Sequence, residues 1–97
     1  MAKFELPIVD FEHDTIKKTY GRNFLSTELY IRSREISEKV EDLSELELLT
    51  ELCGMFQRMF PELTDDEYWN HTDPAYILQL YRDLLTKSTK IVSSKNG

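Results

Sequence analysis

Few side chains in this sequence could do covalent chemistry: there is one cysteine and there are two histidines. Cys53 falls on the most apolar row of residues in the chain, where a thiolate would be costly and a small buried side chain is favoured. His13 lies in a predicted turn with no nucleophile nearby in the sequence. A small hydrolase built around Cys53 and His71 is the least favoured class of function, and full function in Cys53→Ala would eliminate it.

Acidic residues near the second histidine could bind a hard metal ion. His71 and Asp73 follow the run Asp65-Asp66-Glu67, but the spacing matches neither an EF-hand nor a zinc pattern. Helix capping explains the carboxylates, because Thr64-Asp65-Asp66-Glu67 has capping-box spacing and acidic groups favour a first helical turn. The glycines are isolated and form no phosphate-binding loop. The sequence therefore predicts no enzyme, no cofactor and no metal site.

The composition sets the class of protein that must position any functional side chains. Ninety-seven residues, 40% hydrophobic and 31% charged with three Gly and three Pro, predict a single domain spanning 1–97. A net charge of −6 argues against nucleic acid and anionic lipid as partners. The sequence shows no membrane span and no signal peptide, which predicts a cytoplasmic protein. A lone cysteine excludes an internal disulfide.

The N-terminal residues predict a β-hairpin over 3–20. Phe4, Leu6 and Ile8 alternate on one side of an extended segment, and Pro7 confines that segment to a sheet edge. A polar turn follows, and a second run of β-formers covers 15–20. Two strands are marginal alone, so their apolar side needs a helix or another chain to pack on.

The remaining chain predicts a helical bundle over 26–90. Apolar spacing and caps indicate helices over about 27–41, from Ser44 to Pro61, from Thr64 through Trp69, and over about 74–89. Residues 91–97 are small and polar, which predicts a frayed tail. The expected fold class is α+β, mostly α, with a hairpin followed by about four helices.

The second predicted helix carries two apolar rows, which need covering on two sides. One row is Leu46, Leu49, Cys53, Phe56 and Phe60. The other row is Leu48, Leu52, Met55 and Met59. The hairpin and the other helices could cover both rows. Alternatively, the second row faces a groove or a partner helix, because thioethers repack around varied apolar surfaces. We take these four residues as the candidate partner-binding site.

Charges are segregated along the chain. Basic residues gather between Lys17 and Arg34, and an acidic stretch covers Glu35 to Glu51. Solvated helix faces explain both groups. The functional alternative is a homo-oligomer in which opposite charges meet between copies, helped by an unpaired strand edge.

Four segments resemble a known family: Lys17 to Phe24, Leu29 to Ile36, Phe56 to Phe60, and Leu63 to Glu67. Together with the order of the predicted elements, they resemble the small tail assembly chaperones of long-tailed bacteriophages, over roughly residues 3–90. The chain departs from the pattern at His71-Thr72-Asp73-Pro74, where relatives often have a glycine before the final helix.

The resemblance implies a non-enzymatic assembly factor in the host cytoplasm that is absent from the mature virion. Its partners would be the tape measure protein, which it keeps soluble, and the tail-tube protein, whose subunits it helps to gather. Surplus apolar rows in a chain of charge −6 suit that role, since they cover exposed apolar surface while the chain stays soluble. The family often has a longer, frameshifted form with a second domain.

A competing hypothesis is an acidic helical adaptor or inhibitor that sequesters a partner protein. It would use the Glu35 to Glu51 stretch instead of the apolar rows. Ionic strength separates the two hypotheses, because contacts between exposed charges weaken in salt and apolar contacts do not.

Overall fold

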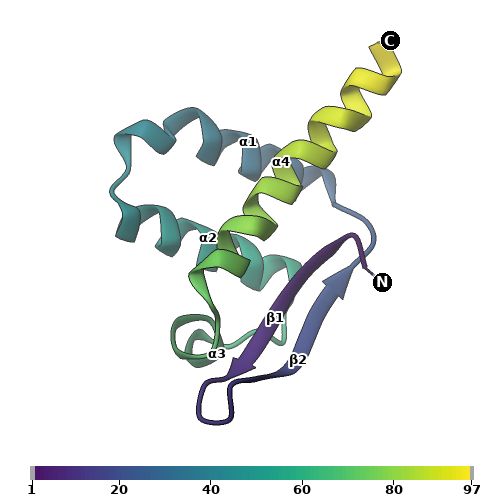
Figure 1. The fold of residues 1–97 in the computed structure, drawn as a ribbon. Coiled ribbons are helices and arrows are strands. Elements are labelled where there is room, and N and C mark those ends of the chain that lie inside the picture. The colour runs from purple at the N-terminus through teal and green to yellow at the C-terminus, as the bar shows by residue number, and fades with distance from the viewer. Residues whose placement is uncertain (1, 97) are drawn as a thin grey trace.

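The computed structural model describes the backbone of residues 2–96 and the side chains of residues 2–86. Over this range a two-stranded antiparallel hairpin precedes four α-helices and one short 3-10 helix (Figure 1). The elements are β1 (Phe4–Asp10), β2 (Thr15–Arg22), α1 (Thr27–Lys39), η1 (Val40–Asp42), α2 (Glu45–Met59), α3 (Asp65–Asn70) and α4 (Pro74–Asn96). The predicted fold class, α+β and mostly α, is confirmed.

The hairpin packs one face on the helices. Phe4, Leu6 and Ile8 of β1 are all buried, as their alternation predicts, and β1 lies against α4 (Figure 1). Pro7 opposes Thr19 in the register. An irregularity follows Ile8, where β2 has one extra residue relative to β1. β1 is therefore the inner strand and β2 the outer strand.

Side-chain caps begin the helices where the sequence predicts them. The Ser44 and Thr64 hydroxyls accept hydrogen bonds from the amides of Glu47 and Glu67, and each glutamate accepts one from the amide of its capping residue. Ser26 caps α1 in the simpler way, accepting from the Leu29 amide at 3.2 Å. These bonds satisfy amides that a helix start leaves without partners, which explains why the boundaries are predictable.

The last helix is longer than predicted. α4 begins at Pro74, as expected from Asp73-Pro74, and the Asp73 carboxylate accepts the Ala75 amide at 2.8 Å. It continues to Asn96, beyond the predicted end near Thr89 and through most of the segment predicted to fray. No proline or glycine occurs between Ala75 and Asn96 to stop the helix. Gly97 lies outside the described residues.

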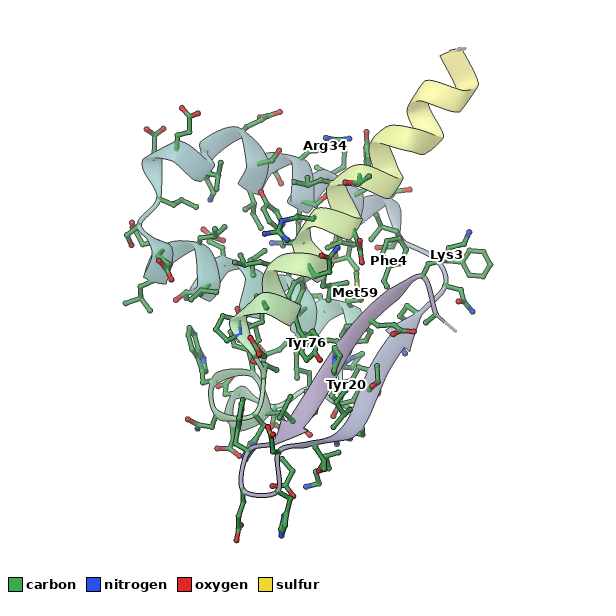
Figure 2. All side chains as sticks on the ribbon, in the orientation of Figure 1. Lys3, Phe4, Tyr20, Arg34, Met59 and Tyr76 are labelled. Carbon is green, nitrogen blue, oxygen red and sulfur yellow. The ribbon has the colours of Figure 1, made fainter. Side chains whose placement is uncertain are left out.

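Apart from the exposed Leu46, both apolar rows of α2 pack in or against the core, which corrects the predicted partner-binding surface. Leu52, Met55 and Met59 are 0%, 2% and 5% exposed, and Leu48 is partly buried against the same cluster. Figure 2 shows Met59 between α4 and the hairpin. Residues from four other elements complete this core: Phe4, Leu6, Ile8, Leu29, Ile36, Tyr68, Ile77, Leu80 and Leu84. Helical periodicity marks an apolar face, but it does not report which elements cover that face.

None of the described helices is both long enough and apolar enough to cross a membrane.

Candidate interaction surfaces

The cysteine is placed as a core side chain. Cys53 is 6% exposed within α2, and burial raises the pKa of its thiol, with the Asp65 carboxylate adding to the shift. A raised pKa keeps the group a thiol near neutral pH, and a thiol is a much weaker nucleophile than a thiolate. The environment of Cys53 fits the packing role that its apolar row predicts.

The first histidine lies in the hairpin turn with two acidic neighbours. Asp10, Glu12 and His13 bring potential metal ligands within 4.8 Å of one another. The Asp10 carboxylate is already engaged: it accepts the amides of Glu12 and His13 and lies 2.7 Å from the His13 ring Nδ1. The His13 contacts are the main cause of the lowered pKa of Asp10. These bonds shape the turn, in which Asp14 has a positive φ of 54°.

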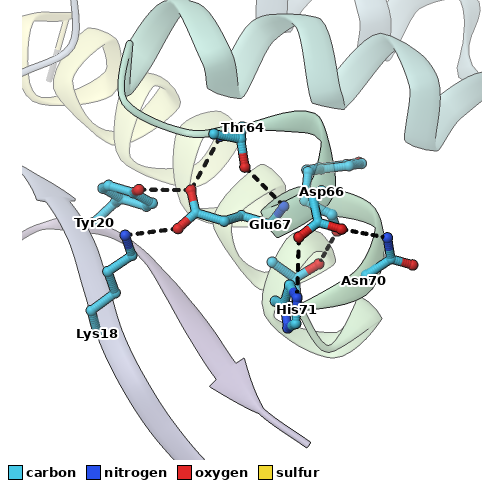
Figure 3. A network of polar contacts seen from close by, with 9 residues as sticks. Lys18, Tyr20, Thr64, Asp66, Glu67, Asn70 and His71 are labelled. Atoms are coloured by element: carbon cyan, nitrogen blue, oxygen red, sulfur yellow. Dashed lines mark hydrogen bonds and ion pairs between the residues drawn. The ribbon is translucent and has the colours of Figure 1, made fainter.

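The second histidine joins α3 to the hairpin. The carbonyl of His71 accepts the Val9 amide at 2.7 Å, and its ring Nε2 lies 3.3 Å from the Asp66 carboxylate. Asp66 also accepts a hydrogen bond from Asn70 (Figure 3). Among the other acidic residues considered as metal ligands, Glu67 and Asp73 accept cap bonds, as the capping interpretation predicts, and Asp65 accepts a hydrogen bond from Gln57 of α2.

Glu67 of α3 is the centre of a network that sequence reasoning missed (Figure 3). One carboxylate oxygen accepts the Thr64 amide at 3.1 Å and the Tyr20 hydroxyl at 2.8 Å, and the other lies 2.7 Å from Lys18 Nζ. Burial opposes ionisation, but the bonds from Lys18 and Tyr20 outweigh it and lower the pKa of Glu67 to about 2. The same pairing raises the pKa of Lys18. The network fastens β2 to the start of α3.

Aromatic contacts reinforce this attachment. The rings of Tyr20 and Phe60 are stacked, with their centroids 5.7 Å apart. The Arg22 guanidinium also packs on Phe60, 5.4 Å from its ring centroid. The inner face of β2 thus carries Lys18, Tyr20 and Arg22, all directed at α3 and the end of α2. In the sequence only the alternation of Lys18 and Tyr20 was visible, because the second strand was predicted to end at Tyr20.

The outer strand of the hairpin is exposed over most of its length and carries cations, whereas β1 and the turn carry the carboxylates of Glu5, Asp10, Glu12 and Asp14. Every residue from Thr15 to Thr19 is exposed. β2 contains Lys17, Lys18 and Arg22 and no carboxylate, in a chain of net charge −6. In Figure 1 β2 forms the outer border of the hairpin, with β1 between it and α4. These three cations are the part of the predicted basic group that lies in the hairpin.

The acidic part of the predicted charge segregation lies at the link between α1 and α2. Exposed carboxylates cluster there on Glu38, Glu41, Asp42, Glu45 and Glu47. Leu46, 66% exposed, lies among them in the sequence. This link and the hairpin lie at opposite sides of the molecule (Figure 1). The cations of β2 thus lie far from these carboxylates, but Arg32 and Arg34 of the predicted basic group lie in α1, on the same helix as Glu38. Assembly between copies stays a prediction.

A groove of about 240 Å³ lies between α1 and α2. Ile36 and Met55, both core residues, contribute apolar atoms to it, and its other lining residues are Arg32, Glu35, Lys39 and Glu51. Two ion pairs join the helices, Lys39 with Glu51 at 2.9 Å and Arg58 with Glu28. Met55 is the member of the predicted partner-binding row that lines this groove.

Comparisons with protein-family models, with curated proteins and with solved structures each found no match.

Proposed function

We propose that this chain is a non-enzymatic tail assembly chaperone of a long-tailed bacteriophage. It acts in the host cytoplasm, binds the tape measure protein, keeps it soluble and helps to recruit tail-tube subunits. The proposal rests on the resemblance of the segments from Lys17 to Phe24 and from Leu63 to Glu67, with the two segments between them. The order of elements, a hairpin followed by helices, agrees with that resemblance.

The groove between α1 and α2 is the observation that best supports a helical partner. Adjacent helices leave a valley that the side-chain ridge of a third helix can enter. Here the valley exposes a small apolar patch, since Ile36 and Met55 at its base are 5% and 2% exposed, and two charges of each sign surround it. A tape measure helix exposes an apolar stripe before tube protein surrounds it, so this groove would bind that stripe while the charges set its register.

Filling the groove tests this role. Glu35 lines the groove and is exposed, so Glu35→Tyr adds bulk there without disturbing the core. Glu38→Tyr is the matched control, because Glu38 is an exposed residue of the same helix that does not line the groove. Both variants should keep the melting temperature of the natural chain. We expect Glu35→Tyr to lose co-purification with a co-expressed tape measure protein and Glu38→Tyr to retain it.

Two results would contradict the proposal at different levels. Equal co-purification of both variants would remove the groove as the binding site. A natural chain that neither binds the tape measure protein nor increases its soluble fraction would remove the chaperone function.

The acidic link between α1 and α2 favours a second candidate, the adaptor that sequesters a basic partner. Its carboxylates are exposed, so a contact through them should weaken strongly as the Debye length shrinks from about 30 Å at 0.01 M to about 3 Å at 1 M salt. The double variant Glu41→Lys, Asp42→Lys should then abolish binding while Glu35→Tyr has no effect. Salt-resistant binding that Glu35→Tyr removes favours the chaperone instead.

A further inference from the structure

A glycine lies in the middle of α2, where the fold itself does not require one. Gly54 is exposed, and a methyl group in place of its hydrogen would have no other part of the fold within 4 Å. A left-handed backbone does not explain it either, because no glycine among the described residues has a positive φ. Glycine inside a helix lowers stability relative to alanine. Alanine would fit here and stabilise α2, so the glycine points to a contact outside the folded chain.

Gly54 borders the groove between α1 and α2. Glu51 and Met55 line that groove from the side of α2. Gly54 follows Glu51 by three residues, so the two are neighbours on the helix surface, and it precedes the buried Met55 on the side that faces solvent. The α2 wall of the groove is therefore lowest at Gly54, where the backbone of another molecule can come closest.

Ion pairs lie on both sides of Gly54 along α2. Glu51 pairs with Lys39 at 2.9 Å, and Arg58 pairs with Glu28. Glu51 and Arg58 are seven residues apart in the sequence. That separation corresponds to about 10 Å of helix, close to the diameter of one helix with its side chains. Because the charges of these four residues are matched within the chain, a helix that crosses between the two pairs needs no charged group there.

We propose that a partner helix crosses α2 at Gly54, with alanine or glycine at the crossing and a leucine or methionine beside it that enters the groove. The small residue lets the two backbones approach closely. The large apolar residue covers the parts of Ile36 and Met55 that remain exposed at the base of the groove. This inference rests on the proposed function, because it names the kind of tape measure segment that the groove binds.

The α2 helix of a second copy does not have the side chains that this site needs. Its exposed residues within about one turn of Gly54 are Thr50, Glu51 and Arg58, and none of them is a large apolar residue. Two copies that crossed at Gly54 would leave the apolar base of both grooves uncovered. A helix with an apolar stripe of alanine and leucine fits the surface better than a second copy does.

The first arm of the test changes Gly54 in the full chain. Gly54→Ala should raise the folded-to-unfolded ratio by up to about fivefold in urea unfolding, because alanine is the better helix former. Gly54→Leu should stay folded, since its side chain has open space. Thr86→Leu is the matched control, at an exposed position of α4 outside the groove. Co-purification with a co-expressed tape measure protein should fall at least ~10-fold in Gly54→Leu, less in Gly54→Ala, and not in Thr86→Leu.

The second arm measures the chemistry of the partner with the natural chain. The probe is a fluorescein-labelled helical peptide of about 18 residues with blocked ends, an apolar stripe of alternating alanine and leucine, and glutamate and lysine elsewhere. A second peptide has leucine in place of each stripe alanine, which makes it more apolar at the same charge. By fluorescence anisotropy we expect saturable binding of the first peptide and at least ~10-fold weaker binding of the second, a difference that Gly54→Leu removes.

Several outcomes would overturn the inference. Equal co-purification of Gly54→Leu and Thr86→Leu with the tape measure protein would do so and leave the chaperone function intact. Equal or tighter binding of the all-leucine peptide, or saturable binding of neither peptide, would remove the small-residue crossing. Self-association in sedimentation that Gly54→Leu abolishes would assign the surface to a second copy. Because the peptide comparison uses the natural chain, it decides the question even if Gly54→Leu fails to fold or the tape measure protein does not bind.

Discussion

The chain contains the same capping motif twice, at the start of α2 and at the start of α3. Only the second motif also binds another element, the strand β2. In both, a hydroxyl residue and a glutamate three positions later satisfy each other's backbone amides. Glu47 makes only this local exchange among its described bonds, whereas Glu67 also accepts Tyr20 and pairs with Lys18. The pKa of each is lowered, that of Glu67 to about 2. The comparison shows that a local motif becomes a tertiary anchor when another element reaches it.

The largest expected loss of stability comes from a substitution in the aromatic layer beneath both capping motifs. Phe56 of α2 is 0% exposed and meets Tyr68 of α3 edge to face at 6.3 Å. Phe56→Ala should destabilise the chain by about 3–5 kcal/mol, because a large buried ring leaves a cavity. That is a large share of the roughly 5–10 kcal/mol available to such a domain. Urea unfolding measures it, with the exposed Leu46→Ala as control; a loss below about 1 kcal/mol would mean that the two helices do not share a core.

The next largest effect compares the stability lost when each of the two capping glutamates is replaced by alanine. Glu67→Ala removes the cap bond and the contacts with Tyr20 and Lys18, so we expect a loss of about 2–3 kcal/mol from several hydrogen bonds to a charged group. Glu47→Ala removes only the exposed cap bond and should cost distinctly less. Equal losses in urea unfolding would refute the view that Glu67 anchors the hairpin.

Contacts between residues close in the sequence could be predicted, and contacts between distant residues could not. Both capping boxes, the hairpin and the proline start of α4 were visible in the sequence, because each depends on residues within a few positions of one another. The Tyr20 to Glu67 bond joins residues 47 apart, and no local pattern encodes it. The same limit misplaced Leu52, Met55 and Met59 on a surface, since the elements that cover them come from distant parts of the chain.

The pH dependence of stability sharpens the comparison. The folded-state pKa of Glu67, about 2, lies below its ordinary value of 4.5, so its contribution is fully present above pH 4.5 and is lost as the pH falls toward 2. We expect about 2 kcal/mol of acid-dependent stability from this group, given 1.4 kcal/mol per pKa unit and partial screening. Glu67→Gln cannot titrate and should lose less stability between about pH 6 and pH 3 than the natural chain. All other carboxylates are the same in the natural chain and in Glu67→Gln. Identical losses of stability in the two would therefore show that Glu67 is not the source of the acid-dependent stability.

The smallest predicted loss of stability is that of the Tyr20 hydroxyl alone, with the Tyr20 ring kept in place. Tyr20→Phe keeps the stack on Phe60 and removes the hydrogen bond to Glu67, so the expected loss is about 1 kcal/mol. The Glu67→Gln background tests the cause, because an uncharged acceptor makes a weaker bond. In a double-mutant cycle the loss from Tyr20→Phe should be smaller in Glu67→Gln than in the natural chain, while in Glu47→Gln it should be unchanged. Strict additivity with Glu67→Gln would show that the hydroxyl contributes through another neighbour, and that the anchor consists of Lys18 and the aromatic stack alone.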